Sequence, residues 1–563
     1  MTDVNDFTLT QTQKYSALTN PTANERGNYY NVNFNAGLHY DRTFGRHSIS
    51  AAAFMRTYQN QVNVIESTDY SNLSSNRFLS WNGQATYIYD GRYILSGSLS
   101  RMGCDNYAED GRWGTFYGVS GGWVASEEPW LKTPNVDLLK LRASFGHTGQ
   151  SSTGTNRYPY QSTYAFGTGY SFGTSNSGIS GIYESLAGNA NNRWEVSDMV
   201  NVGLDFDFFH HRLYGSVDAF KEWRSDILIN RSVIPQLLGV SVAKDSYGKV
   251  ESHGVEMTLG HRNKVGDFHY YVEGMLTYNT NKITEMDEPE PNVPWQRKTG
   301  GRIREYTEVA ALYEQPFDNT VGGWNLFKFQ QWASDPALIA TSKQDAIDHP
   351  EKYPYNVASG GIQPLGTAVF RDINGDRQID DNDKVPSGYT IIPELIPSAT
   401  VGFEWKGFDA RAVFTAYLNR SVFLSPSVSY SGWSNMGTHE VTKAWGYYTD
   451  DPTDPRNVNA RYPRPVYGGF NPVDSERSTG TYHNDIWIVN GNYLSLRNIE
   501  VGYSLPQKLI AKASMTKCRV YFSGYNLANW SHLPKDIDPE KPMSYVWWYP
   551  KTRSFTFGVN IGF

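Results

Sequence analysis

Six oxygen-bearing side chains recur at alternating positions in one acidic segment. They fall at positions 1, 3, 5, 7, 9 and 12 of a calcium-binding loop: Asp372, Asn374, Asp376, Gln378, Asp380 and Asp383. Such spacing lets oxygen ligands surround one hard cation, with Gln378 contributing its backbone carbonyl. Arg377 replaces the usual glycine, and the last ligand is Asp rather than Glu. The spacing predicts a structural Ca2+ site, and the alternative is a hydrated turn held by Asp and Asn.

Aromatic residues gather in segments rich in Gly, Ser, Asn, Asp and Pro. Aromatic planes pack against the C–H faces of sugar rings, and neighbouring polar groups can bind hydroxyls. We therefore expect some of these residues to bind a cargo, whereas others pack loops together, lie at a membrane interface or contact a partner protein. The candidates are Trp324, Phe327, Trp332, Trp433, Trp445, Tyr447, Tyr448, Trp487, Trp547, Trp548 and Tyr549.

Adjacent carboxylates, Glu127 with Glu128 and Asp450 with Asp451, raise the possibility of glycoside hydrolysis. Neighbouring residues on a strand point to opposite faces, however, so these pairs do not favour catalysis. The sequence also has no H-E-x-x-H segment and no phosphate-binding P-loop. We therefore expect a protein that is not an enzyme and that requires no cofactor.

Composition narrows the class of protein further. The chain of 563 residues contains 39 Tyr, 27 Phe and 16 Trp, and such amphipathic rings suit membrane interfaces and sugar-binding surfaces. The net charge of −7, without a basic stripe, gives no indication of nucleic-acid binding. No apolar run approaches the ~18 residues of a membrane-spanning helix. Strands that cross a membrane hide their hydrophobicity in alternation, so membrane insertion stays open.

Apolar and polar residues alternate strictly in several segments of about ten residues, the length that crosses a bilayer as a tilted strand. Clear examples lie at 32–41, 200–208, 268–278 and 410–419. The polar face carries charges and amides, and Tyr and Trp cluster near the strand ends, as in a membrane barrel with a wet interior. We predict an all-β fold: a transmembrane antiparallel β-barrel wall of about 15 strands with long extracellular loops.

Short turns and long connections alternate along the chain. We expect tight turns near residues 44–46, 90–91, 209–210, 264–266 and 406–407, and two short helical connections at 127–132 and 506–514. Long connections at 150–195, 280–395 and 421–492 contain little alternation. Cys104 and Cys518 would lie at opposite ends of strands, ~25 Å apart, so we predict two free thiols.

The chain closes on an alternating strand that ends in an aromatic residue: Phe555, Phe557, Val559, Ile561 and Phe563. Such an ending is the signal that the outer-membrane assembly machinery recognises, and the alternative is the last strand of a soluble β-domain. Because the pattern coincides with the membrane-type alternation elsewhere, we predict an assembly signal.

Several segments, in order along nearly the whole chain, resemble the SusC/RagA family of TonB-linked outer-membrane proteins. They are YDRTFGRHS (40–48), RWGTF (112–116), GW (122–123), SEEPWL (126–131), LKLRASFG (139–146), GVE (254–256), DINGD (372–376), NYLSLRN (492–498) and FGVNIGF (557–563). The resemblance implies a 22-stranded barrel with an N-terminal plug, energised through TonB. It also implies a SusD-like surface lipoprotein as a lid, and oligosaccharide or peptide as cargo.

The sequence departs from that family at its beginning, because it has no plug domain, TonB box or signal peptide. The first and last strands would both run inward, which fits a barrel lacking its first seven strands. We therefore expect residues 1–563 to form the C-terminal portion of the barrel, paired in the lipid of the outer membrane with an N-terminal plug-bearing part that contacts TonB.

The expected function is outer-membrane nutrient import of oligosaccharides, in which this chain supplies the barrel wall and the cargo-binding loops. A peptide importer of the same family is the nearest alternative. A passive porin and a secreted carbohydrate-binding β-protein are alternatives of another class, and a non-functional gene remnant is a further one.

Overall fold

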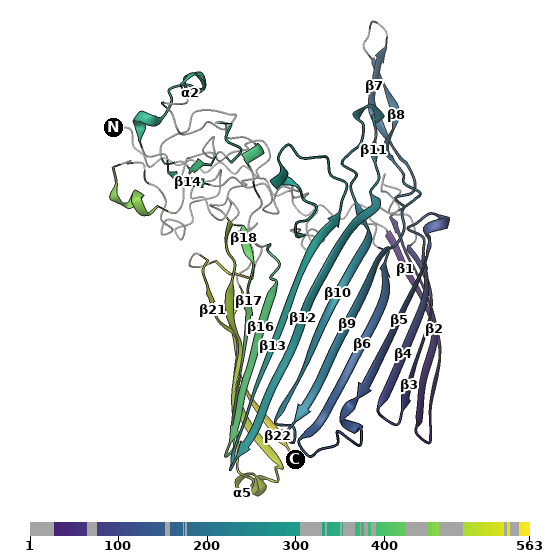
Figure 1. The fold of residues 1–563 in the computed structure, drawn as a ribbon, viewed down its shortest axis with the longest axis vertical. Helices are drawn as coiled ribbons and strands as arrows, with labels where there is room; N and C mark the ends of the chain where they lie inside the picture. The colour runs from purple at the N-terminus through teal and green to yellow at the C-terminus, as the bar shows by residue number, and fades with distance from the viewer. Residues whose placement is uncertain are drawn as a thin grey trace.

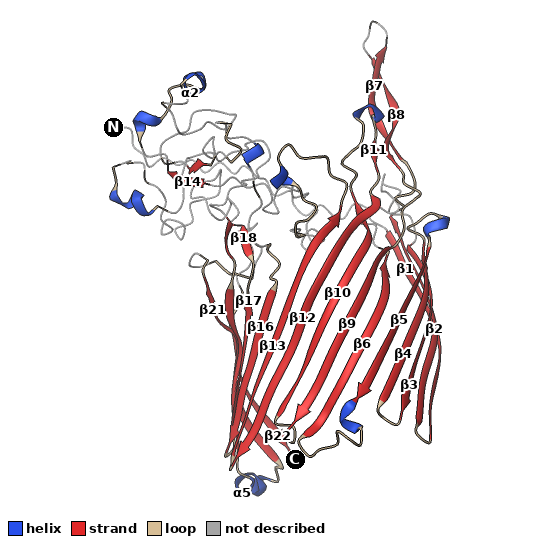
Figure 2. Ribbon diagram, in the orientation of Figure 1, coloured by secondary structure: helices blue, strands red, loops and turns tan. Residues whose placement is uncertain are grey.

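The architecture is a large antiparallel sheet, seen in a computed structural model (Figures 1 and 2). The structure describes residues 27–64, 76–151, 158–172, 174, 177–303, 329–332, 335–349, 352, 366, 368–371, 373–376, 381–383, 385, 390–423, 449, 451, 453–460, 488–533, 537–540 and 551–563. Within them, fifteen strands pair in one sheet in the order β1-β2-β3-β4-β5-β6-β9-β10-β12-β13-β16-β17-β20-β21-β22. The predicted all-β fold and strand number are confirmed.

The strands of this sheet are long and tilted, as membrane-crossing strands are. Their bounds are β1 Gly27–Phe44, β2 His47–Val64, β3 Asn76–Tyr89, β4 Tyr93–Cys104, β5 Trp113–Val124, β6 Val136–Gln150, β9 Glu195–Phe208, β10 Leu213–Ile229, β12 Asp245–Val265, β13 Phe268–Glu285, β16 Leu395–Trp405, β17 Phe408–Tyr417, β20 Tyr493–Ser504, β21 Lys517–Ser531 and β22 Ser554–Gly562. β1 and β22 are the two edges of the sheet as described.

Smaller elements lie in the connections. The remaining strands are β7 Thr163–Phe172, β8 Ser177–Ala187, β11 Ser241–Val242, β14 Phe329–Trp332, β15 Ala368–Phe370, β18 Ser421–Phe423 and β19 Ile488–Asn490. The helices are α2 Lys343–Asp348, α5 Gln507–Ile510, and the 3-10 turns η2 Glu109–Gly111, η3 Ala125–Glu127, η4 Gln236–Leu238, η5 Pro294–Gln296, η6 Pro336–Leu338, η7 Asp381–Asp383, η8 Pro455–Asn459 and η9 Ala511–Ala513. Among the described residues, none of the helices combines the length and apolarity needed to cross a membrane.

The register keeps one face of the sheet apolar from strand to strand. Phe268 lies opposite Trp405, Trp405 opposite Phe408, and Phe408 opposite Tyr503, so four neighbouring strands present a row of rings. These rings are solvent-exposed: Phe268 is 38% exposed, Trp405 48% and Phe408 50%. A soluble monomer rarely exposes so extended an apolar surface, so this face suits a lipid environment.

The opposite face is polar because each strand alternates. One position along from the aromatic row, His269 pairs with Glu404, Glu404 with Asp409, and Asp409 with Gly502. A sheet with an apolar outer face and a charged inner face is the wall of a barrel with a wet interior. The alternation of apolar and polar residues in the sequence therefore corresponds to side chains that point in turn to the outer and the inner face of the wall.

At one end of the sheet the strands are joined by short turns (Figure 1). The two-residue turn at Lys406 and Gly407 has positive φ at both positions (48° and 90°), as a type I′ hairpin turn requires. The helical connection predicted at 127–132 begins two residues earlier, as the 3-10 turn η3, and continues as a turn in which Glu128 O accepts the N–H groups of Leu131 and Lys132. The helix predicted near 506–514 is α5 followed by η9. We name this end the short-turn end, and the opposite end the long-loop end.

The short-turn end also contains an unusual turn between β9 and β10. Phe209, His210 and His211 all have left-handed backbone, with φ of 58°, 61° and 64°. Each such residue costs roughly 1–2 kcal/mol. Asp137 accepts the His211 N–H at 3.0 Å, and the Asp207 carboxylate bonds His211 Nδ1 at 2.5 Å. These contacts offset the strain.

The long-loop end contains more regular structure than the sequence predicted. β7 and β8 form a hairpin inside the expected loop 150–195, and β11 adds to it in parallel. Figure 1 shows this hairpin extending well beyond the end of the barrel wall. The expectation of an irregular loop there is wrong, because turn-forming Gly and Ser residues within short strands masked the alternation.

Candidate functional site

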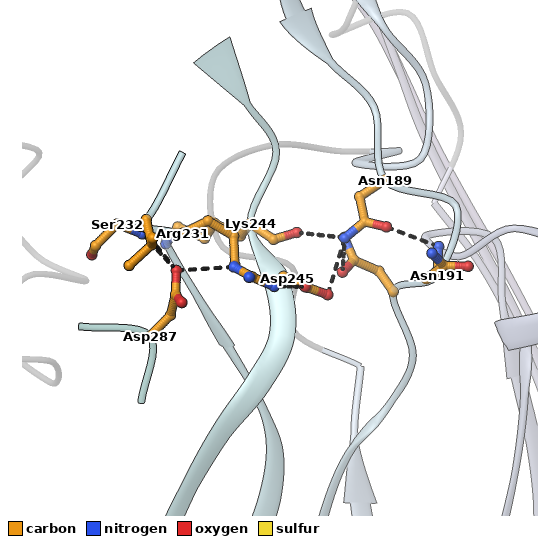
Figure 3. Close-up of polar contacts among 9 residues, drawn as sticks. Asn189, Asn191, Arg231, Ser232, Lys244, Asp245 and Asp287 are labelled. Carbon is orange, nitrogen blue, oxygen red and sulfur yellow. Dashed lines mark hydrogen bonds and ion pairs between the residues drawn. The ribbon is translucent and has the colours of Figure 1, made fainter. Parts of the chain in front are cut away.

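The long-loop end carries a polar network centred on Arg231, which follows β10 (Figure 3). Its Nη1 donates to Asp245 Oδ2 at 2.8 Å, and its Nε donates to Asp287 Oδ2 at 2.9 Å. Asp245 is the first residue of β12, and Asp287 follows the end of β13. One planar guanidinium therefore ties together the ends of three strands. We call Asn189, Arg231, Asp245 and Asp287 the Arg231 clamp.

Asp287 also holds the chain that follows Arg231. Its Oδ2 accepts the backbone N–H groups of Ser232 at 2.8 Å and Val233 at 3.2 Å. Desolvation raises the pKa of Asp287, but these N–H donors and Arg231 outweigh it and leave the pKa below its ordinary value. The bonds to Asp245 and Asp287 raise the pKa of Arg231. Arg231 and Asp287 are therefore both charged at neutral pH.

The clamp reaches the base of the projecting hairpin through two asparagines. Asn189 Nδ2 donates to Asp245 Oδ1 at 3.1 Å, and Asn192 Nδ2 donates to the Lys244 carbonyl at 2.9 Å. Asn192 is only 1% exposed. Because both asparagines follow β8, the position of the β7–β8 hairpin is coupled to the clamp.

A small apolar core supports the same end of the wall. Tyr107, Phe116 and Trp194 pack together with Cys104, and all four are buried. Trp194 Nε1 donates to the Arg112 carbonyl at 3.2 Å. This packing fixes the connection between β4 and β5 against the start of β9.

The inner face of the wall contains ion pairs that join neighbouring strands. Arg142 on β6 donates to Asp205 at 2.8 and 2.9 Å and to Asp218 at 2.7 and 2.9 Å. Gly203 lies beneath this group, where an added Cβ would come within 2.6 Å of Asp218 Oδ1. A glycine is therefore required for the arginine to lie flat between the two carboxylates.

A second inner-face group lies nearer the short-turn end. Arg519 on β21 donates from Nε to Asp409 at 2.9 Å and from Nη2 to Glu500 at 2.7 Å. Both arginines are held by carboxylates on neighbouring strands, which fixes charge in the wall. Such a wall suits water and polar solutes rather than an apolar ligand.

Three of the predicted calcium ligands lie in the described part of the chain. Asp383 is fully buried, and its Oδ1 accepts the backbone N–H of Ile373 at 2.7 Å and of Asn374 at 3.4 Å. Asn374 Nδ2 donates to Asp376 Oδ2 at 2.9 Å. The loop thus closes on the carboxylate predicted at position 12. Asp372, Gln378 and Asp380 lie outside the described residues.

The predicted cargo-binding aromatics remain predictions. Trp332 ends β14, which pairs with β15, but its side chain is not described. The other candidates lie outside the described residues: Trp324, Phe327, Trp433, Trp445, Tyr447, Tyr448, Trp487, Trp547, Trp548 and Tyr549. The rim that the structure describes is therefore built by polar contacts and by the small core.

The closing residues form β22 as the sequence predicted. Phe557 lies opposite Phe522 and Val559 opposite Val520, so the apolar side chains share the outer face. Phe557 is 73% exposed and Phe563 85%. This placement fits an assembly signal, and the role itself stays a prediction.

In the acidic pair at 127–128, Glu128 holds neighbouring elements together. Glu128 is buried and accepts hydrogen bonds from Arg92 at 3.0 Å, Tyr93 at 2.6 Å and Trp123 at 3.2 Å. These contacts tie η3 to the turn between β3 and β4. Cys104 and Cys518 are both free thiols, as predicted.

No sequence pattern predicted the Arg231 clamp. Asp245 lies 14 residues and Asp287 lies 56 residues from Arg231 in the sequence, in connections without a repeated motif. Only strand register brings these connections together at the rim. The sequence did not predict the contact of Arg142 with Asp205 and Asp218 either. Each of the three residues occupies a polar position in an alternating strand, but nothing in the sequence pairs them.

Comparisons with known proteins give one consistent result. No protein-family model matches the chain. The TonB-dependent receptor P3 of Formosa agariphila is 25% identical over 575 aligned positions, covering 93% of this chain and 52% of that protein. The TonB-dependent receptor SusC of Bacteroides thetaiotaomicron is 27% identical over 512 positions, covering 88% and 45%. The chain thus spans about half the length of these relatives.

Solved structures share the fold. The structure of the RagAB peptide transporter superposes with a TM-score of 0.65 at 17% identity, covering 95% of this chain and 56% of that chain. The 'open-open' state of the RagAB peptide importer gives a TM-score of 0.67 at 16% identity, with 95% and 55% coverage. At these identities, the similarity establishes the barrel-wall architecture.

Proposed function

We propose that this chain, which is similar to the TonB-dependent receptors P3 and SusC and shares the fold of the RagAB peptide transporter, is a β-barrel protein of the Gram-negative outer membrane and forms most of the wall of a nutrient importer. The wall encloses a wet passage, and the connections at the long-loop end face the cell exterior and receive the cargo. The short-turn end faces the periplasm.

One observation carries this proposal: the sheet has an apolar face and a charged face, which the register shows across β13, β16, β17 and β20 of its fifteen paired strands. The outer rings need lipid, whereas paired charges such as Arg142 with Asp205 and Asp218 need water or polar solute. A secreted carbohydrate-binding protein has no need of such an outer face. A passive porin would need a closed sheet, and in the described residues β1 and β22 are not paired with each other.

The two sheet edges support a partner for the wall. Unpaired backbone groups cannot persist in lipid, so β1 and β22 need further strands. We propose that a plug-bearing N-terminal part of the same transporter supplies them and carries the contact with TonB. Residues 1–563 then act as the C-terminal portion of one barrel.

The long-loop end supports the cargo and lid assignments. The projecting β7–β8 hairpin and the clamped rim offer a broad surface to a SusD-like surface lipoprotein. Oligosaccharide is the cargo we propose, because aromatic residues abound in the long connections and can stack on sugar rings. A peptide cargo is the alternative, and the loop that closes on Asp383 is proposed to hold a structural Ca2+.

The test begins with purification of the chain from its native outer membrane in mild detergent, with mass spectrometry of every co-purifying protein. We expect a plug-bearing polypeptide and a lipoprotein. Uptake of labelled oligosaccharides and labelled peptides by intact cells would then identify the cargo, and a protonophore should abolish it. The proposal would be contradicted if the chain were absent from the membrane fraction, or if uptake continued unchanged in the presence of the protonophore.

A further inference from the structure

A cluster of metal-binding side chains lies at the short-turn end of the wall (Figure 1). It consists of Asp137 on β6, Asp207 on β9 and His211 in the turn that leads to β10. One carboxylate oxygen from each aspartate and one imidazole nitrogen lie within 4.8 Å of one another. Ligand atoms bound to one Zn2+ ion are ~3–4 Å apart, so small side-chain adjustments would place these three atoms around a single cation.

A bulge in the pairing of β6 with β9 brings Asp137 to this cluster. The register between the two strands shifts at Asp137, which is the extra residue between Val136 and Leu138. Such a bulge redirects a side chain from the regular alternation of the strand. Asp137 Oδ2 accepts the His211 N–H at 3.0 Å, which holds the carboxylate beside the turn. Strand register thus joins two candidate ligands that are 74 residues apart in the sequence.

Asp207 has a buried oxygen atom that lacks a hydrogen-bond donor. Its side chain is 18% exposed, and its Oδ2 bonds His211 Nδ1 at 2.5 Å. Within the described part of the chain, its Oδ1 has no hydrogen-bond partner. A buried charged oxygen without a partner is unfavourable, and such an atom in a native structure calls for an explanation. A cation bound at the cluster would satisfy it.

The two carboxylates also lack a neutralising side chain. In the described residues, neither Asp137 nor Asp207 forms an ion pair with an arginine or a lysine. Arg262 is close, but its Nε donates to the His211 carbonyl at 2.7 Å and its guanidinium lies over the Tyr214 ring at 5.2 Å. Two carboxylates and a neutral imidazole therefore match the charge of one divalent cation.

The turn that carries His211 has a backbone that an ion would stabilise. Phe209, His210 and His211 are three consecutive residues with left-handed backbone, whereas the other non-glycine residues of this kind in the described chain occur one at a time. Each such residue is unfavourable and persists only where surrounding contacts hold it. An ion bound to His211 and to both aspartates would cross-link the turn to β6 and β9.

The ligand types select the class of ion. Carboxylate oxygens bind many divalent cations, whereas imidazole favours Zn2+ and related transition metals over Ca2+ and Mg2+. Three protein ligands leave one position of a tetrahedral ion for water or for a donor from another chain. The cluster therefore differs in chemistry from the oxygen-only loop that closes on Asp383.

We propose that Asp137, Asp207 and His211 bind a divalent transition-metal ion, with Zn2+ as the best match, and that this ion fixes the β9–β10 turn against β6. All three ligands come from this chain. The proposal goes beyond the import function and does not depend on the cargo. Metal binding is measured on the purified protein, so its failure leaves the uptake experiment unaffected.

The test uses the protein purified in mild detergent with everything that co-purifies, freed of metal by EDTA and dialysed. Isothermal titration calorimetry with ZnCl2, in an excess of Ca2+ that fills oxygen-only sites, measures the affinity. We expect Asp137→Asn, Asp207→Asn and His211→Asn each to weaken Zn2+ binding about tenfold or more. Asparagine tolerates left-handed backbone, so His211→Asn removes the imidazole and keeps the turn. Circular dichroism and resistance to SDS verify that each variant is folded.

Two further measurements locate the ion. Zinc-edge X-ray absorption should show nitrogen and oxygen ligands that include an imidazole, and the imidazole contribution should disappear in His211→Asn. Hydrogen exchange followed by mass spectrometry should show that Zn2+ slows amide exchange at residues 208–213 in the wild type. In His211→Asn the same addition of Zn2+ should leave exchange in this segment unchanged.

His147→Gln is the matched control. His147 Nδ1 bonds Asp198 Oδ1 at 2.7 Å, but among the described residues no third metal-binding group joins this pair. His210→Gln is the control for the turn, since His210 shares its backbone conformation but is not one of the three ligands. Both variants should bind Zn2+ as the wild type does.

The assignment would be overturned if the wild type showed no saturable Zn2+ binding in excess Ca2+. Affinity that stayed unchanged in both Asp207→Asn and His211→Asn would also overturn it. A loss of affinity in His147→Gln or His210→Gln as large as that in His211→Asn would contradict it too, because binding would then not depend on the three proposed ligands.

Discussion

Arg231, the second residue after β10, donates a hydrogen bond of 2.8 Å to Asp245, the first residue of β12. The connection between these strands contains η4 and β11, and it is closed at its base by this pair. Because β11 pairs with β8, the same closure orients the projecting hairpin. The rim is thereby held by a few charged contacts rather than by a large apolar core.

The first prediction concerns this clamp. Arg231→Gln should loosen the chain at 188–193 and 230–245, because Asp245 and Asp287 lose their shared cation. Lost charge-assisted bonds are worth about 1–3 kcal/mol, so amide exchange there should accelerate roughly tenfold or more. Hydrogen exchange followed by mass spectrometry measures this. Arg456→Gln is the control, since its pair with Asp454 lies within one exposed turn. Equal amide exchange in the two variants would contradict a stabilising role for Arg231 at the rim.

The second prediction concerns the barrel wall. Arg142→Gln leaves Asp205 and Asp218 facing each other without a cation, and should lower stability by about 3 kcal/mol. Arg142→Lys should recover only part of the loss, because an ammonium cannot bond both carboxylates bidentately. Urea unfolding in detergent, followed by tryptophan fluorescence, gives the comparison. A midpoint that does not move in Arg142→Gln would refute the role given to this group.

The third prediction tests the calcium loop with Tb3+. Trp295 Nε1 donates to the Asn382 carbonyl at 3.1 Å, so its ring lies beside the loop and can sensitise a bound lanthanide. We expect Tb3+ luminescence on excitation of tryptophan, displaced by Ca2+ and lost in Asp376→Asn. Asp451→Asn, in a separate loop, should leave the signal intact. Luminescence that persists in Asp376→Asn would favour the hydrated turn.

The fourth prediction concerns assembly. Phe563→Ala should lower the fraction of the chain that reaches the outer membrane several-fold, because the terminal aromatic residue is part of the proposed signal. Membrane fractionation and heat-modifiable migration in SDS gels measure that fraction. Phe209→Ala, which removes an exposed aromatic from a turn, serves as the control. Normal insertion of Phe563→Ala would leave β22 as an ordinary edge strand.

The fifth prediction is a pH effect at the short-turn end. The hydrogen bond to Asp207 raises the pKa of His211 above its ordinary value of about 6.5, with Asp137 and Arg262 as the other charged neighbours. A raised pKa means that protonated His211 supports the turn fully below pH ~6.5 and loses that support as pH rises through the raised value. Histidine NMR titration should show the raised pKa in the wild type and a fall in Asp207→Asn. An unchanged pKa in that variant would exclude Asp207 as the cause.

Local sequence patterns predicted the strands because they depend on neighbours within one or two residues. Alternation placed β9, β13 and β17, and glycine-containing turns such as Lys406 and Gly407 placed the hairpins between them. The β7–β8 hairpin escaped because bulges interrupt its pairing after Thr163 and Gly167, so its alternation breaks within a few residues. With its alternation interrupted, the segment had the sequence pattern of an irregular loop.

The sequence by itself determined that this protein has an apolar and a polar face on every long strand, since the side-chain period of a strand is two residues. It also determined the free thiols, the closing aromatic strand and the order of the hairpins. Only the tertiary structure decided which charges meet, such as Arg231 with Asp287 and Arg142 with Asp218. These contacts depend on the register across neighbouring strands and on which distant connections come together at the rim. The spacing of residues along the chain specifies neither of these.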